Sequence, residues 1–254
     1  MKLSSSTQYI RSMKLNRENI NSFDEYPFDL QAVYNLYELS FHPRVTFIVG
    51  ENGTGKSTIL EAVAIAYGFN PEGGTKNFNF NSRDTYSQLN ENIRLIKGPY
   101  APKDGFFFRA ESFYNVASNI DDLAKTAPGG LAFLNLYGGK SLHAQSHGES
   151  FFSLFVSRFS GNSLYILDEP EAALSASRQM AMVRRMHELI QHNCQFIIAT
   201  HSPIIMAYPD SIIYEINASN ITQKDYDETE NYQVMRSFFD NPKRIIDMLM
   251  KDNE

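Results

Sequence analysis

The stretch GENGTGKS, residues 50–57, limits what this chain can fold into more than any other part of its sequence. It follows the β-branched run VTFIV at 45–49 and precedes STILEAVAIAY at 57–67, whose apolar side chains recur at helical spacing. A strand, a glycine-rich loop and a helix are therefore predicted in immediate succession. Glycines permit backbone angles at which successive N–H groups converge on one anion, and the N-terminus of the following helix attracts the same anion. We expect this loop to bind phosphate groups.

The loop fits the pattern G-x-x-x-x-G-K-[ST] at Gly50, Gly55, Lys56 and Ser57. In that pattern the lysine neutralises the β- and γ-phosphates of a nucleotide, and the last hydroxyl is a ligand of Mg²⁺. The residues predicted to contact the nucleotide are Gly50, Asn52, Gly53, Thr54, Gly55, Lys56, Ser57 and Thr58. The alternative is a glycine-rich turn that carries a surface lysine.

Short apolar runs alternate with helical patterns along the rest of the chain. Strands are predicted at 106–109, 163–169, 195–200 and 211–216, and helices at 82–97, 112–126, 150–159 and 175–192. Continuous apolar strands that alternate with helices form parallel sheets buried on both faces, so we expect an α/β fold with a parallel core sheet flanked by helices. Antiparallel edge strands are expected in the first 40 residues and at 211–225, and two short polar-faced helices after 230.

The length of the chain bears on its domain organisation. At 254 residues it is near the upper end of what one hydrophobic core organises. Hydrophobic residues make up 43% of the sequence, which is typical of a folded globular protein rather than of a disordered one. We therefore predict a single domain over residues 1–254, with a small helical insert at about 82–145.

The run SLYILDEP ends a buried strand with two carboxylates, Asp168 and Glu169. Two carboxylates at the carboxyl edge of a central strand are costly unless positive charge lies beside them. A nucleotide bound with Mg²⁺ supplies that charge. We predict that Asp168 holds the metal ion and that Glu169 is the general base for the water that attacks the γ-phosphate. The alternative is an acidic start of the helix that follows.

The segments GENGTGKST, QSHGE, LYILDEPEAALS and ATHS together resemble, in order and spacing, the motif set of the ABC ATPases. The chain is most similar to the soluble branch that includes SMC-like and AAA-type ATPases, and within it to small stand-alone bacterial ATPases. The resemblance covers about residues 40–216 and implies a P-loop NTPase fold. It also implies Mg²⁺-dependent hydrolysis of ATP by a homodimer that sandwiches two nucleotides between its subunits.

The resemblance assigns Ser146, His147, Gly148 and Glu149 to the signature motif, which in that family contacts the γ-phosphate held by the other subunit. His147 stands where the family usually has glycine. From the residues alone, the same segment predicts a capping box, in which the serine caps the helix and the glutamate three residues later completes the cap. The resemblance also makes His201 the switch histidine, which senses the γ-phosphate and orients the attacking water.

Further positions follow the family pattern more loosely. Glu111 stands where the family has the glutamine that reaches the metal ion; a surface glutamate is an equal alternative, and Gln88 lies early for this role. Ser175 replaces the aspartate that often ends the segment matched by AALS. The candidates for an aromatic platform under the adenine are Tyr26, Phe28 and Phe41, each of which could instead belong to the core.

Charge and composition limit the partners. The net charge of −6 gives no overall field that attracts nucleic acid, so DNA binding would need a local basic patch. No run reaches the ~20 apolar residues of a membrane span, and the N-terminus lacks the apolar segment of a signal peptide, so we expect no membrane insertion. The single cysteine, Cys194, suits a reducing cytoplasm, where we expect the protein to lie.

Three functions compete at this point. The first is an ATPase whose dimer closes on ATP, reopens after hydrolysis and drives a conformational change in an unidentified partner. The second is an ATP-gated dimerisation switch with little turnover, with DNA repair and phage defence as candidate processes. The third is a small-molecule or nucleoside kinase, which shares the glycine loop but does not need QSHGE, DEP or ATHS. Residues 112–144 are too few for a coiled-coil arm, which disfavours an SMC-like tether.

Overall fold

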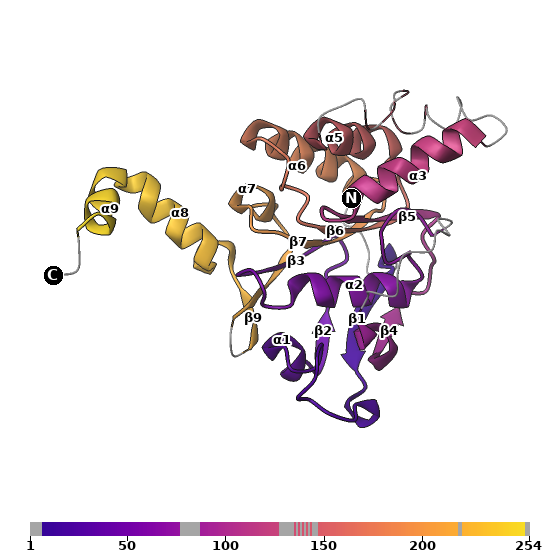
Figure 1. Ribbon diagram of the computed structural model, residues 1–254, viewed down its shortest axis with the longest axis horizontal. Coiled ribbons are helices and arrows are strands. Elements are labelled where there is room, and N and C mark those ends of the chain that lie inside the picture. The colour runs from indigo at the N-terminus through magenta and orange to yellow at the C-terminus, as the bar shows by residue number, and fades with distance from the viewer. Residues whose placement is uncertain are drawn as a thin grey trace.

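The centre of the computed structural model is a six-stranded sheet in the order β5-β6-β7-β3-β8-β9 (Figure 1). The first five strands of that order are parallel, and β9 is antiparallel to β8. The bounds are β3 Val45–Gly50, β5 Asp104–Arg109, β6 Ser163–Asp168, β7 Gln195–Ala199, β8 Ile212–Ile216 and β9 Ile221–Lys224. The predicted α/β fold with a parallel core sheet and an antiparallel edge is confirmed.

The structure describes residues 7–76, 87–126, 147–217 and 220–251, together with Asn135, Tyr137, Gly139, Ser141 and His143. Within these residues the sheet is buried on both faces, which is why its strands are continuous apolar runs. Every residue of β6 and β7 is buried. Successive side chains point to opposite faces, so Phe47 and Val49 join one apolar cluster and Ile48 joins the other.

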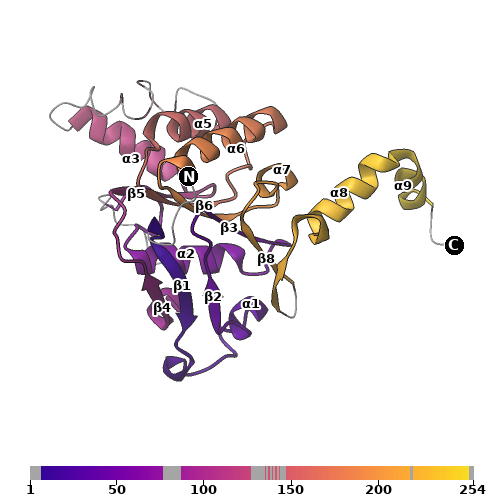
Figure 2. The same ribbon diagram turned by 180° about the vertical axis from the view of Figure 1, so that it is seen from behind.

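Helices cover the two faces of the sheet. The face with Phe47 packs against α3 (Phe113–Thr126), α5 (His147–Arg158), α6 (Ala176–Gln191) and the short α7 (Pro203–Met206). The opposite face packs against α2 (Lys56–Tyr67) and the short α1 (Gln31–Tyr34). Figure 2 shows the same layers from behind, with α2 between the core sheet and a second sheet. The chain also forms 3-10 helices at Arg17–Asn19, Gln88–Asn92 and Tyr226–Glu228.

The second sheet is antiparallel and has the order β2-β1-β4, with β1 at Ile10–Leu15, β2 at Glu38–Ser40 and β4 at Ile93–Lys97. The helix predicted over 82–97 is therefore wrong in its described part. The run IRLIK forms β4 because pairing with β1 satisfies its backbone and directs Ile93 into the core beneath α2. The proposed insert at 82–145 contributes a strand to each sheet, and the division into domains stays a prediction.

Two helices end the described part of the chain, α8 at Glu230–Asp240 and α9 at Pro242–Leu249, as the sequence predicts. Neither helix contains a buried residue. Both stand out from the body of the molecule, to the left in Figure 1 and to the right in Figure 2. No helix among the described residues is long and apolar enough to cross a lipid bilayer.

Candidate active site

The glycine loop connects the end of β3 to the start of α2, so the predicted strand, loop and helix are confirmed. Gly50 and Gly55 have φ angles of 142° and 98°, a region that side chains rarely occupy. A Cβ atom on Gly50 would also lie 2.2 Å from the carbonyl oxygen of Ile216 on β8. The loop is rich in glycine because its backbone turns sharply beside a neighbouring strand.

Lys56 is held inside the loop rather than on the surface. Only 4% of the residue is exposed, and its Nζ donates a hydrogen bond to the carbonyl oxygen of Glu51 at 2.8 Å. Burial lowers the pKa of the ammonium group, while the charges of Glu169, Asp168 and Glu171 act in the opposite direction. A buried cation at the start of a helix is suited to neutralise an anionic ligand.

Asp168 ends β6 and faces the first turn of α2. Its Oδ1 accepts a hydrogen bond from Ser57 Oγ at 3.1 Å, and 4% of the residue is exposed. Burial raises the pKa of this carboxyl group to about 7, although the charge of Arg109 and the bond from Ser57 act against the rise. A buried carboxylate beside a hydroxyl oxygen supplies the hard oxygen ligands that Mg²⁺ prefers. Ser57 and Asp168, two of the three residues that we predicted as metal ligands, therefore fit a divalent cation.

Glu169 and His201 meet across neighbouring strands. Glu169 directly follows β6 and His201 follows β7, and Glu169 Oε1 lies 3.5 Å from His201 Nε2. This Nε2 atom is buried and makes no hydrogen bond. Glu169 adopts the left-handed backbone conformation, with φ at 49°. The two side chains predicted to act on the attacking water thus lie beside each other.

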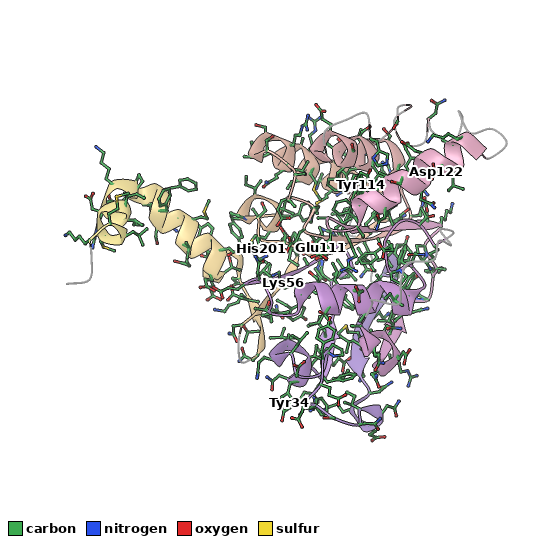
Figure 3. The ribbon with its side chains drawn as sticks, viewed as in Figure 1. Tyr34, Lys56, Glu111, Tyr114, Asp122 and His201 are labelled. Carbon is green, nitrogen blue, oxygen red and sulfur yellow. The ribbon has the colours of Figure 1, made fainter. Side chains whose placement is uncertain are left out.

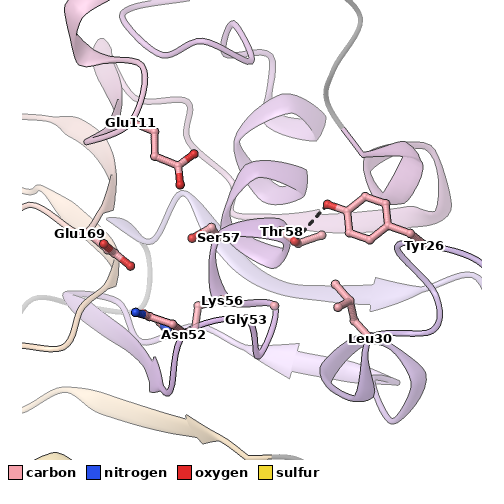
Figure 4. Close-up of a pocket in the computed structure, with 10 residues that line it drawn as sticks. Tyr26, Leu30, Asn52, Gly53, Lys56, Ser57, Thr58, Glu111 and Glu169 are labelled. Atoms are coloured by element: carbon pink, nitrogen blue, oxygen red, sulfur yellow. Dashed lines mark hydrogen bonds between the residues drawn. The ribbon is translucent and has the colours of Figure 1, made fainter.

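Lys56, Ser57 and Glu169 line one cavity of about 430 Å³, shown in Figure 4, whereas Asp168 and His201 are not part of its lining. Its lining consists of Tyr26, Leu30, Asn52, Gly53, Gly55, Lys56, Ser57, Thr58, Glu111 and Glu169. Gly50 lies at the end of β3, and Thr54 borders a neighbouring hollow of about 500 Å³. The structure therefore brings most of the predicted loop residues, together with Glu111 and Glu169, to a single opening.

The three aromatic residues predicted as candidates for contact with the nucleobase differ in their position relative to the cavity. Phe28 and Phe41 are buried in the core beneath the sheet. Tyr26 lines the cavity, is 63% exposed, and places its hydroxyl 3.5 Å from Thr58 Oγ1. Of the three, only Tyr26 has a ring that a ligand in the cavity could reach.

Glu111 lies beyond the end of β5 and reaches the cavity, as Figure 3 and Figure 4 show. Its side chain is largely exposed, and its Oε2 lies 3.5 Å from Arg109 Nη2. Gln88, the alternative, begins a 3-10 helix beside the antiparallel sheet and does not line the cavity. The position of Glu111 suits the predicted role, and metal binding by it stays a prediction.

The predicted signature segment lies on the other face of the sheet from α2. Ser146 falls outside the described residues, and α5 begins at His147. Gly148 packs so closely that a Cβ atom would lie 2.0 Å from the carbonyl oxygen of Ala173, and Glu149 Oε1 accepts a bond from Arg178 Nη2 at 3.4 Å. Neither Gly148 nor Glu149 lines the cavity of its own chain.

Two residues near the site were not predicted from the sequence. The first is Glu171, a largely buried residue whose Oε1 accepts a bond from the backbone N–H of His201 at 2.5 Å. Its Oε2 is buried without a partner, and burial raises the pKa of the carboxyl group. It is the third acid of DEPE, a run for which the sequence analysis gave an acidic helix start only as the alternative. Its contact with His201 depends on the tertiary fold, so only the run of three acids could have drawn attention to it.

The second is Arg109, the last residue of β5. Its guanidinium group forms a buried ion pair with Glu61 of α2, and its backbone is in register with Asp168. Arg109 thus joins the helix that follows the glycine loop to the strand next to the acidic strand end. A lone arginine at the end of FFFRA is the only sequence signal of this role.

Comparisons with known proteins give matches to families and folds. A family model described as an AAA domain matches residues 14–118, and one described as an AAA ATPase domain matches residues 149–206. No curated protein matches the sequence significantly. Both descriptions agree with the ATPase-type resemblance that we drew from the motifs.

Solved structures similar to this chain include three nucleotide-binding domains. The SMC head domain from Thermotoga maritima matches with a TM-score of 0.43 and 19% identity, over 86% of this chain and 100% of that one. The protein cbiO1 from Clostridium perfringens, part of an ABC transporter complex, matches with a TM-score of 0.47 and 17% identity over 96% and 100%. A nucleotide-free ATP-binding cassette from an ABC transporter matches with a TM-score of 0.49 and 13% identity over 96% and 100%.

Proposed function

We propose that this chain, a P-loop ATPase domain of the ABC and SMC-like type, binds ATP with Mg²⁺ and hydrolyses it in a two-copy sandwich. One observation carries the proposal. Lys56, Ser57 and Glu169 line one cavity at the carboxyl ends of parallel strands, and Ser57 and Glu169 in turn contact Asp168 and His201. This is the edge at which α/β proteins bind their ligands.

The chain itself supplies the binding groups. The N–H groups of the glycine loop and the Lys56 ammonium would receive the β- and γ-phosphates, and Tyr26 would lie against the base. Ser57 and Asp168 would hold Mg²⁺, which when bound neutralises charge on the phosphates. The raised pKa of Asp168 is consistent with a carboxylate that gains from a cation.

Hydrolysis needs a base and a group that orients the water. Glu169 accepts the proton of the attacking water while the water oxygen bonds to the γ-phosphorus and the bond to the β-phosphate oxygen breaks. His201, 3.5 Å away, orients that water, and Glu171 fixes the backbone of His201. The products are ADP and inorganic phosphate. Because both side chains belong to strand ends rather than to a long loop, the pair is held ready for turnover.

A second copy completes the site in this proposal. Gly148 and Glu149 do not line the cavity of their own chain and sit at the start of a helix, whose N–H groups attract an anion. In a two-fold arrangement the segment at 146–149 of one copy meets the γ-phosphate held by the other. Closure on ATP and reopening after hydrolysis would then drive a conformational change in a partner protein.

The test uses a variant that binds ATP and does not hydrolyse it. Glu169→Gln removes the base and keeps the shape of the side chain, so ATP should hold the variant as a dimer in sedimentation velocity runs. Lys56→Ala is the matched control and should bind no nucleotide and stay monomeric. A Glu169→Gln variant that remains monomeric with saturating ATP would contradict the sandwich. Comparing steady-state turnover with the dimer lifetime separates an ATPase from a slow switch.

A further inference from the structure

The helices α8 and α9 form an apolar arm, defined here as residues 230–250. Neither helix buries a residue against the rest of the chain, although Phe239 is 67% and Leu249 is 75% exposed. Other large apolar side chains exposed on the arm are Val234, Met235, Met248 and Met250. Exposed apolar surface gathered on one element marks an interaction site in most folded proteins. The two helices match the sequence prediction, and each also exposes apolar side chains that the sequence analysis did not single out.

The arm is rooted at the nucleotide site. Asn231 Nδ2 donates a hydrogen bond to the carbonyl oxygen of His201 at 3.2 Å. The N–H of Glu230 donates to Glu215 Oε1 at 2.8 Å, and Glu230 lines the hollow that shares Asn52 and Gly53 with the nucleotide cavity. The first turn of the arm is therefore part of the same molecular face as the glycine loop and the switch histidine.

A groove runs along the base of the arm, between α7 and α8. Its volume is about 430 Å³, and its apolar lining includes Ile204, Ala207, Met235 and Phe239. Met235 and Phe239 also belong to the exposed face of the arm, so groove and arm form one continuous apolar surface. α7 begins two residues after His201, the predicted γ-phosphate sensor, and α8 bonds to the backbone of His201 through Asn231. Both helices that border the groove are therefore attached close to this histidine.

The arm carries no net charge, unlike the whole chain, whose net charge is −6. Within residues 230–250 the basic residues Arg236, Lys243 and Arg244 balance the acidic residues Glu230, Asp240 and Asp247. A neutral apolar segment can therefore approach a second copy of this chain without the repulsion that an acidic segment would meet.

We propose that the arm packs against a second copy of this chain when the nucleotide sandwich closes. The inference rests on the proposed function, because that function brings the cavity faces of two copies together. An arm rooted on that face and directed away from its own body meets the other copy, and two-fold symmetry gives each copy the same contact. Its bond to His201 links the packing of the arm to the position of the histidine.

The first experiment changes exposed arm residues in the Glu169→Gln background. Phe239→Ser combined with Leu249→Ser removes two apolar side chains that are mostly exposed in the monomer, so the unfolding temperature of the monomer should change little. With ATP, the dimer dissociation constant from sedimentation equilibrium should rise about tenfold or more. The matched control is Tyr100→Ser, an aromatic residue that is 62% exposed and lies before β5, at the opposite edge of the sheet.

Three outcomes have distinct meanings. A monomeric Glu169→Gln parent in ATP would contradict the proposed function itself. A parent that pairs, with an arm variant that pairs equally well, would overturn the arm inference alone and would leave an effector protein as the occupant of this surface. Hydrogen exchange gives the second readout: amides of 230–250 should exchange more slowly in the ATP-bound parent than in the monomer. Unchanged exchange there would also overturn the inference.

Discussion

At the scale of single residues, Asp168 makes stability depend on pH. Its pKa rises from 3.8 to about 7 because the carboxyl group is buried. Between those values the folded chain keeps a proton that the unfolded chain releases, so stability falls as the pH rises through this range. We expect Asp168→Asn, without nucleotide, to match the parent near pH 4 and to exceed it above pH 7 by on the order of 2–4 kcal/mol. Urea unfolding at pH 4.5 to 8 checks this, and parallel curves for the two proteins would contradict it.

Glu171 lends itself to a kinetic prediction. Its carboxylate accepts the N–H of His201 and does not itself line the cavity. Glu171→Ala should therefore lower kcat by about 10- to 100-fold through misplacement of the histidine and leave KM for ATP nearly unchanged. Glu171→Gln keeps an acceptor oxygen and should recover most of the rate. A rise in KM with an unchanged kcat would show that the residue acts elsewhere.

The sequence predicts the main site residues because their places are tied to strand ends. Lys56, Asp168 and His201 each follow or end a continuous apolar run, and the carboxyl ends of parallel strands meet at one edge. Glu171 and Arg109 have no such marker. Their partners, the backbone of His201 and the side chain of Glu61, come from other elements and are brought close only by the fold.

At the scale of elements, the start of α5 depends on a close contact. A Cβ atom on Gly148 would lie 2.0 Å from the backbone of Ala173, which cannot yield as a flexible side chain would. Gly148→Ala should push α5 away from the segment after β6 and lower the free energy of unfolding by about 1–3 kcal/mol. Urea unfolding measures the loss. Glu149→Ala removes a partly exposed ion pair with Arg178 and should change it by no more than about 1 kcal/mol.

Continuous apolar runs predict β3, β6 and β7 well because a strand that is buried on both faces favours apolar side chains along its whole length. The error at 93–97 has a different origin. In IRLIK, polar and apolar residues mix in a way that suits a helix or an edge strand, and the choice is made by pairing with β1, about 80 residues earlier. No local pattern contains that information.

At the scale of the whole molecule, a site shared by two copies makes the rate depend on protein concentration. If each cavity needs residues 146–149 of another copy, the rate per chain should rise with concentration and level off once dimers dominate. We expect this curve in steady-state ATPase assays over two decades of concentration. The Phe239→Ser, Leu249→Ser variant should reach the plateau at higher concentration. A rate per chain that is constant over the whole range would place all catalytic groups in one copy.

The sequence predicts the layers of sheet and helices, but it does not predict that the arm stands away from the body of the molecule. The sequence predicts two helices after 230, but whether their apolar residues are covered depends on where the chain directs them after β9. That direction is set by contacts such as the bond from Asn231 to His201, which join segments about 30 residues apart.

One consequence concerns how the protein could be improved by selection. Glu169 has a left-handed backbone conformation, with φ at 49°. Glycine would adopt this conformation at a free-energy cost lower by about 1 kcal/mol. A screen that rewarded only heat resistance would therefore favour glycine at this position and discard the proposed general base. The strand end keeps a residue with a strained backbone, and this strain is the loss of stability that accompanies the proposed ATP turnover.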